Sequence, residues 1–168
     1  MVNTEELVKI QQDIISSKCS DNKVELKKNW KGYGIYANDK LKKDSVIDIY
    51  PMEIVSVYEP QNQNNSYYFD LDQIDYQGDV SYNSYKKCKK YHRDCSAMFA
   101  NEPDPNQNEN STIEVICDET EEEGNICNGI LIAARDIEKG DEITWCYGPD
   151  YERTYETPCL YYDYDYAN

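Results

Sequence analysis

The segment ARDIEKGDEITWCYG spans residues 134–148 and has a clear order of turn, strand and polar aromatic residue. The glycine and charged residues of Glu138–Asp141 are typical of a turn, and Glu142–Trp145 has the composition of a short strand. The segment ends in Tyr147-Gly148, so one residue, Cys146, separates the strand from a phenol. This order predicts a strand that presents a tyrosine at its end.

The same spacing of apolar and turn residues occurs earlier in the chain. Asp44 stands where the later copy has Gly140, and Asp enters the left-handed backbone region at modest cost. The repeat predicts two similar β-corners, and a chance match is the alternative. The matching residues are Ala37, Leu41, Asp44 and Ile47 in the first copy and Ala133, Ile137, Gly140 and Ile143 in the second.

Other segments predict a mainly β chain. β-Branched residues fill Val46–Val57, and Pro51 and Met52 interrupt them, which indicates two short strands or one bent strand. We expect a solvated acidic loop at Asp118–Glu123. Further strand-like runs are 67–71, 113–117 and 130–134.

The N-terminus predicts an amphipathic helix over residues 4–17 that packs on the domain. Asn3 and Glu6 have the spacing of a capping box. The length of 168 residues fits one domain, with expected parts 1–23 (helical extension), 24–152 (β domain) and 153–168 (acidic Tyr-rich tail). The apolar residues at helical spacing are Leu7, Ile10, Ile14 and Ile15.

Charge and composition exclude several classes of function. The chain has 17 Lys and Arg against 33 Asp and Glu, a formal charge of -16, which repels phosphates and favours basic partners. Direct nucleic-acid binding is therefore not expected. There is no apolar run of about 20 residues and no signal-peptide pattern, so we expect a soluble intracellular protein without membrane association.

Metal and thiol chemistry is not expected either. The seven cysteines are odd in number and never form Cys-x-x-Cys, which favours free, partly buried thiols over metal ligands or disulfides. His92 is the sole histidine, which argues against zinc or Ser/His catalysis. Seventeen tyrosines can build a core because each buries a large ring while keeping a polar group.

Two further segments have the composition of ligand-binding loops. Lys31–Ala37 reads KGYGIYA, in which two glycines flank an aromatic residue and allow close approach of a ligand to the backbone. Met98–Pro103 reads MFANEP and is followed by an Asn-rich run to Asn110. Taken singly, each has an ordinary alternative, namely a turn before a strand and an Asn/Pro-rich surface loop.

Together, the three segments resemble the SET-domain lysine methyltransferases over about residues 24–152. They resemble, in order, the family's N-terminal G-x-G segment, its Phe-x-Asn-His-Ser segment and its Gly-[Glu/Asp]-Glu-[Leu/Ile]-Thr strand ending in Tyr-Gly. The Gly-Tyr-Gly front and the ending YGPDY at 147–151 are similar to small viral SET proteins. The Asn-, Tyr- and Asp-rich composition indicates an AT-rich genome, such as a viral one.

The resemblance implies a SET domain, a β-clip of small curved sheets with a C-terminal pseudoknot in which the chain near Tyr147 threads against the Asn101 segment. It implies S-adenosylmethionine as cofactor and methyl transfer to a lysine of a basic protein, such as a histone, with no metal. Tyr147 would be the catalytic tyrosine, and Tyr33 and Tyr151 would line the substrate channel. The implied cofactor-binding residues are Lys31, Gly32, Tyr33, Gly34, Asn101, Glu102 and Tyr147.

The chain departs from the family pattern in the middle segment, where Glu102 and Pro103 replace His and Ser. A carboxylate only accepts hydrogen bonds, so we expect Glu102 to meet the cofactor's ammonium or a nearby backbone donor. Matching Pro105-Asn106 to the family's Pro-Asn would move Asn101 onto the His position. Matching Asn110 instead keeps Asn101 in place, and we prefer that register.

Two other functions stay open from the sequence. Because of Glu102 and Pro103, the chain could be a SET fold that has lost catalysis and binds proteins. Its charge alone would also suit an unrelated acidic β-protein that mimics nucleic acid or sequesters basic proteins. The family's zinc-binding tail cannot form here, since a single cysteine, Cys159, follows Tyr151, so the aromatic tail either packs over the channel or is an exposed acidic extension.

Overall fold

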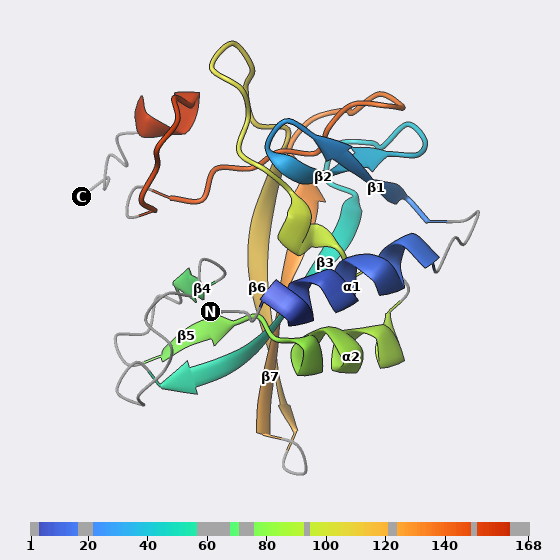
Figure 1. Cartoon of the computed structure of the whole chain (residues 1–168), viewed down its shortest axis with the longest axis vertical. Coiled ribbons are helices and arrows are strands. Elements are labelled where there is room, and N and C mark those ends of the chain that lie inside the picture. The colour runs from blue at the N-terminus through green and yellow to red at the C-terminus, as the bar shows by residue number, and fades with distance from the viewer. Residues whose placement is uncertain are drawn as a thin grey trace.

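The computed structural model of the protein describes residues 4–16, 22–56, 68–70, 76–92, 95–120, 124–148 and 151–161. Its strands form a two-stranded and a five-stranded antiparallel sheet, with two helices packed to one side (Figure 1). This confirms the expected mainly β architecture. The strands are β1 Val24–Asn29, β2 Gly32–Ala37, β3 Val46–Ser56, β4 Tyr68–Asp70, β5 Tyr76–Asp79, β6 Ser111–Thr120 and β7 Gly124–Ala133.

The smaller sheet is a β1–β2 hairpin, and the larger has the order β4-β5-β3-β7-β6. The expectation of an acidic loop at Asp118–Glu123 is wrong for its first three residues, because β6 continues through Asp118 to Thr120 and pairs with β7. The long β6–β7 pairing carries both strands beyond their apolar runs. A hairpin can extend in this way because backbone hydrogen bonds need no apolar side chains.

β3 is one strand and continues through Pro51, which decides between the two expectations for this segment. Pro51 lies opposite Asn128 of β7, whereas pairing of β3 with β5 begins only at Glu53. The missing N–H therefore leaves no ladder hydrogen bond unmade on the β5 side. A register shift between Val46 and Asp48 bends the start of the strand.

Helix α1, Thr4–Ser16, agrees with the predicted N-terminal helix and packs against α2, Tyr82–Tyr91 (Figure 1). Ile10 is fully buried and Ile14 packs on the core, but Ile15 is 43% exposed. Asn3 and the side chain of Leu7 lie outside the described residues. Within the described part of the chain, neither helix is long and apolar enough to cross a membrane.

The sequence did not predict α2 or the 3-10 turns η1, Ala97–Phe99, and η2, Pro158–Tyr161. α2 is rich in lysine, so its apolar pattern is weak, although Ser81 and Ser84 form a reciprocal capping box at its start. η1 is completely buried. The buried Asp48 carboxylate accepts hydrogen bonds from the backbone N–H and the hydroxyl of Ser96, which fixes the start of η1.

The predicted repeat is confirmed as two interlocked β-corners. Leu41 and Ile137 exchange both backbone hydrogen bonds, each 2.9 Å long. Asp44 and Gly140 have positive φ, 65° and 91°, so each corner turns through the left-handed region at the matching position. The apolar residues of both corners are buried in one core, which joins the hairpin to the larger sheet.

Among the residues whose side chains the structure describes, the expectation of free thiols is wrong for four of the chain's seven cysteines. Cys88 near the end of α2 bonds to Cys95 before η1, and Cys146 bonds to Cys159. Their Cα atoms are 6.2 Å and 5.4 Å apart, within the normal range for a disulfide. The prediction from cysteine spacing failed because the fold, and not the spacing, decides which cysteines lie close together.

Both disulfides can be mapped by digestion without reduction. Trypsin cleaves between the paired cysteines, at Lys89, Lys90 and Arg93 in one case and at Arg153 in the other. We expect mass spectrometry of the unreduced digest to find cross-linked peptides for Cys88–Cys95 and Cys146–Cys159, which separate on reduction. Alkylation of all four thiols in denatured, unreduced protein would contradict the assignment.

Candidate active site

The candidate site is built where the segment before Tyr147 passes between two other segments of the chain. Asn101 forms a parallel bridge with Thr144, and the Trp145 N–H donates to the Asn101 carbonyl at 3.1 Å. On the other side, the N–H groups of Asn110 and Ser111 both donate to the Thr144 carbonyl, at 3.1 and 3.0 Å. The predicted strand Glu142–Trp145 is an extended segment that pairs only through the isolated bridges of Glu142 and Thr144, and we call it the Glu142 strand. It is enclosed on both sides, as the expected pseudoknot requires.

The side chain of Asn110 contacts the same strand through both ends of its amide. Its Nδ2 donates to the Glu142 carbonyl at 2.8 Å, and its Oδ1 accepts from the Thr144 N–H at 2.9 Å. Asn101 and Asn110 therefore lie against the strand together. This arrangement agrees with the register in which Asn101 keeps its place.

Glu142 links this crossing to the hairpin and was not identified from the sequence. Its Oε1 accepts from Asn29 Nδ2 at 2.9 Å and from Asn101 Nδ2 at 2.8 Å. Asn101 Nδ2 also lies 3.1 Å from the Tyr33 carbonyl. The Asn101 side chain therefore joins β2 to the Glu142 strand through its amide.

Gly34 is required by this packing. A Cβ at Gly34 would lie 2.5 Å from Glu142 Oε1 and 2.9 Å from Asn101 Nδ2. Gly32, with φ 118°, has a different role, because it turns the chain and a Cβ there would meet nothing within 4 Å. The sequence predicted that a ligand would approach the backbone closely at both glycines. At Gly34 the space is filled by protein side chains, whereas at Gly32 it is open.

The ammonium group of Lys31 is held by contacts within the protein. Its Nζ donates to the Glu102 carbonyl at 2.6 Å and forms an ion pair with Asp104 at 3.0 Å. The side chain is 12% exposed. Lys31 therefore ties the β1–β2 turn to the 102–104 loop.

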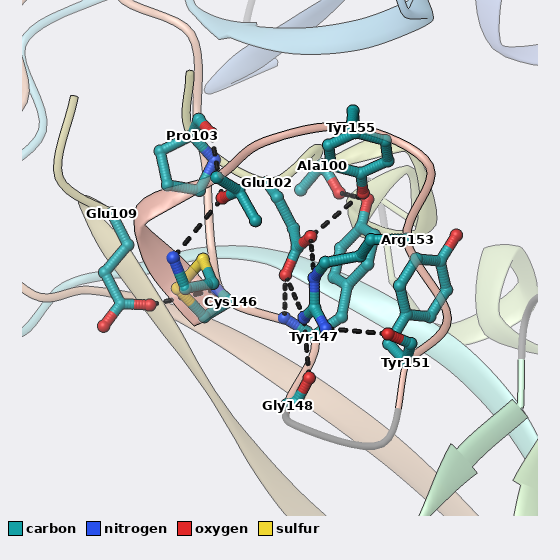
Figure 2. A network of polar contacts seen from close by, with 12 residues as sticks. Ala100, Glu102, Pro103, Glu109, Cys146, Tyr147, Gly148, Tyr151, Arg153 and Tyr155 are labelled. Atoms are coloured by element: carbon teal, nitrogen blue, oxygen red, sulfur yellow. Dashed lines mark hydrogen bonds and ion pairs between the residues drawn. A yellow bond between two sulfur atoms is a disulfide. The ribbon is translucent and has the colours of Figure 1, made fainter. Parts of the chain in front are cut away.

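The Glu102 carboxylate is completely buried and accepts four hydrogen bonds (Figure 2). Arg153 approaches it with Nε at 2.7 Å from Oε2 and Nη2 at 2.6 Å from Oε1. The Tyr147 N–H donates to Oε1 and the Tyr155 hydroxyl to Oε2, both at 2.9 Å. Of the two partners expected for Glu102, the structure provides the backbone donor and leaves no part of the carboxylate exposed for a cofactor ammonium.

Tyr147 lies beside the loop that precedes Asn101. Its hydroxyl donates to the Ala100 carbonyl at 2.8 Å (Figure 2). Burial, reinforced by neighbouring tyrosines and Glu102, holds the pKa of the Tyr147 phenol well above its usual value. The group is therefore a neutral phenol at physiological pH.

Aromatic rings surround the Tyr147 phenol. The centre of the Trp145 ring lies 5.1 Å from the centre of the Tyr147 ring, and that of Tyr151 lies 4.8 Å from it in an edge-to-face arrangement. Desolvation also raises the pKa of Tyr151. The structure thus brings Tyr147 and Tyr151 together, and the assignment of Tyr33 and Tyr151 to a substrate channel stays a prediction.

Arg153 and Tyr155 are the main site residues that sequence reasoning missed. The available signal was Glu102 in place of the family's His, because a carboxylate in a site that excludes solvent requires a cation or several donors. Tyr155 was expected only as part of an aromatic tail, and its hydroxyl bonds to Glu102. Tyr162–Asn168 of that tail lie outside the described residues.

A group of potential metal ligands lies at the same place. Ligand atoms of Glu102, Cys146 and Cys159 are within 4.8 Å of one another. The two sulfurs are bonded to each other, and the carboxylate is held by Arg153, Tyr147 and Tyr155. In the disulfide-bonded protein this group has no ligand atom available for a metal.

Gly34→Ala tests the packing between Gly34 and Glu142. The added methyl group would collide with Glu142 Oε1, so we expect a loss of about 2 kcal/mol in the free energy of unfolding. Glu142→Ala removes the closest contact and leaves those with Asn101 Nδ2 and Asn29 Nδ2, both 2.9 Å away, so the methyl group should cost less in that background. Denaturant melts of the four proteins give this double-mutant cycle, and strictly additive effects would contradict the contact.

The sequence profile of the SET domain family matches residues 32–148. Among curated proteins, none matches this chain. Solved structures that match include a candidate histone methyltransferase of Plasmodium falciparum, with 19% identity, a TM-score of 0.50 and coverage of 74% of this chain and 91% of that one.

KRYPTONITE, solved in complex with mCHH DNA, H3(1-15) peptide and SAH, also matches, with 16% identity and a TM-score of 0.51. The match covers 74% of this chain and 23% of that one. At such identities the two structures show the fold alone. Because the family profile spans well over half of the chain and includes the strand crossing, the chain belongs to the SET domain family.

Proposed function

We propose that the protein is an S-adenosylmethionine-dependent lysine N-methyltransferase acting on a basic, histone-tail-like protein. The observation that carries the proposal is the hydrogen bond from the Tyr147 hydroxyl to the Ala100 carbonyl. Through it a neutral phenol lies beside the backbone carbonyl that precedes Asn101. Family membership and the SAH bound to KRYPTONITE support the choice of cofactor.

The charges around Tyr147 fit a cationic cofactor. The guanidinium of Arg153 is paired with Glu102, and the ammonium of Lys31 is paired with Asp104. Neither cation is left uncompensated, so a sulfonium would meet carbonyl and phenol oxygens and aromatic rings rather than a net positive charge. The residues present therefore fit S-adenosylmethionine.

The residues that would hold the cofactor are the Lys31–Gly34 segment and the Asn101–Glu102 segment. When bound, the cofactor supplies a methyl group on a positively charged sulfur. Lys31 and Asn101 fix the two segments to each other, through the Glu102 carbonyl and the Tyr33 carbonyl respectively. Glu102 takes part through its backbone, since its carboxylate is used within the protein.

Tyr147 would orient the lysine amine rather than remove its proton. Its hydrogen is donated to the Ala100 carbonyl, so the oxygen lone pairs remain to accept an N–H from an amine. A phenol with a raised pKa is a poor base at neutral pH. The rings of Trp145 and Tyr151 would exclude water from the amine, and desolvation favours its neutral, nucleophilic form.

The charge of the protein supports a basic substrate. The formal charge of -16 attracts lysine- and arginine-rich peptides over long range. KRYPTONITE was solved with an H3(1-15) peptide, which makes histone H3 the first substrate to test.

The alternative of a catalytically inactive binding module rested on Glu102 and Pro103. The Glu102 carboxylate accepts four hydrogen bonds from three residues, among them one from the backbone N–H of Tyr147, and Pro103 is fully buried. Glu102 is therefore part of the support of the site, and its presence does not argue for lost catalysis.

Methylation of an H3 N-terminal peptide, measured with isotopically labelled cofactor, tests the proposal. Wild-type protein should transfer label to the peptide, and Tyr147→Phe should lower kcat about 10²-fold by losing the orientation of the amine. Calorimetry should show saturable cofactor binding to both proteins.

Tyr82→Phe is the matched control, because the Tyr82 hydroxyl bonds to Asp13 on the helical side of the molecule. Its rate should equal that of wild type. Cofactor binding without turnover on H3 or on a panel of other basic proteins would favour the binding module. Failure to bind cofactor would overturn the proposal.

A further inference from the structure

The segment that follows Tyr147 returns to the site and delivers a buried arginine to it. Arg153 and Tyr155 both reach Glu102, and the Cys146–Cys159 disulfide joins the far end of the segment to the residue before Tyr147 (Figure 2). The side chains of Glu102 and Arg153 are 0% and 3% exposed. This ion pair is therefore more deeply buried than the others described.

Glu102 transmits the position of Arg153 to the catalytic residue. Arg153 donates a hydrogen bond to each oxygen of the carboxylate, and one of these oxygens also accepts the N–H of Tyr147. Because the guanidinium is planar and makes two parallel hydrogen bonds, it fixes both the distance and the orientation of the carboxylate. The backbone from which the Tyr147 phenol projects is thereby held at one point.

Arg153 also controls the residues on the other side of the phenol. Its Nη2 donates to the Gly148 carbonyl at 2.6 Å and its Nη1 to the Tyr151 carbonyl at 2.7 Å. Its guanidinium carbon lies 5.3 Å from the centre of the Tyr151 ring, which packs edge to face with Tyr147. One side chain therefore positions both Tyr147 and Tyr151.

A lysine cannot make this set of contacts. The guanidinium uses its Nε, Nη1 and Nη2 groups in different directions within one plane, whereas an ammonium is a compact point charge. If Arg153 supplied only a positive charge, lysine could replace it. If its role depends on the planar guanidinium, lysine cannot.

We propose that Arg153 is a positioning residue for the reaction, acting through Glu102 on the Tyr147 backbone and directly on Tyr151. This inference rests on the proposed function and extends it to a residue outside the family profile, which ends at residue 148. The geometry also explains the departure at Glu102, because the carboxylate and Arg153 form one unit.

The fold does not depend on Arg153 alone to keep the segment in place. The disulfide to Cys159, the Tyr155 hydroxyl on Glu102 and the Thr157 hydroxyl on the Pro103 carbonyl, at 3.1 Å, all hold it independently. Variants at Arg153 are therefore expected to stay folded, with the segment still tethered.

The test compares Arg153→Lys, Arg153→Met, Glu102→Gln and the double variant Glu102→Gln/Arg153→Met in the methylation assay. We expect each to lower kcat about 10²-fold, with KM for the peptide and the calorimetric Kd for the cofactor close to wild type. Arg153→Lys should not restore the rate. Arg135→Met is the matched control, since that arginine is exposed and bonds to the Asn108 carbonyl, and its rate should be unchanged.

The double variant separates positioning from stability. Removing both charges relieves the unpaired buried charge, so its melting temperature should recover relative to the single variants. The positioning role predicts that kcat stays low. Recovery of kcat together with stability, or full activity of Arg153→Lys, would overturn the inference.

A second readout keeps this inference distinct from the proposed function. The amide of Tyr147 bonds to a charged oxygen, so its NMR signal should shift in Arg153→Met and Arg153→Lys and stay in place in Arg135→Met. If the wild-type protein does not methylate but this signal moves, the proposed function fails and the coupling of Arg153 to Tyr147 stands. An unmoved signal overturns the coupling whether or not the protein is active.

Discussion

The buried carboxylate of Glu102 is the constraint on which the site depends. A charge without solvent is tolerated only when its lone pairs are satisfied, and breaking such a pair typically costs about 3–5 kcal/mol. Glu102 meets this requirement by recruiting Arg153 and Tyr155 from the C-terminal segment and the N–H of Tyr147. The need to satisfy one carboxylate thereby holds three segments of the chain in a fixed relation.

Two turns position the segments that surround Glu102. Two β-corners, each turning through a residue with positive φ, interlock through Leu41 and Ile137 and place β2 beside the Glu142 strand. The strand then passes between Asn101 and Asn110, and its backbone has no freedom to move away from either. Tyr147 follows this segment, and its hydroxyl donates to the Ala100 carbonyl.

The sequence predicted those parts of the molecule whose signals are local. The corners were predictable because Asp44 and Gly140 occupy matching turn positions, and the crossing was predictable because the Asn101 and Tyr147 segments each resemble a family motif. Glu142 was read only as part of a strand, and its contacts with Asn29 and Asn101 depend on β1 and the Asn101 loop lying beside it.

Long-range partners could not be predicted in this way. Arg153 lies in a polar stretch without periodicity, and nothing near it in the sequence marks it as buried. The cysteines of the two described disulfides follow no spacing rule, because the path of the chain brings the members of each pair together. α2 was missed because its lysines hide the few apolar residues, Tyr85 and Cys88 among them, that face the core.

A crystal structure of the protein with S-adenosylhomocysteine tests the central claim most directly. The account predicts that the ligand lies against Lys31–Gly34 and Asn101–Glu102, and that the Glu102–Arg153 pair is intact in the complex. A ligand bound elsewhere, or bound only after Arg153 has left Glu102, would contradict it.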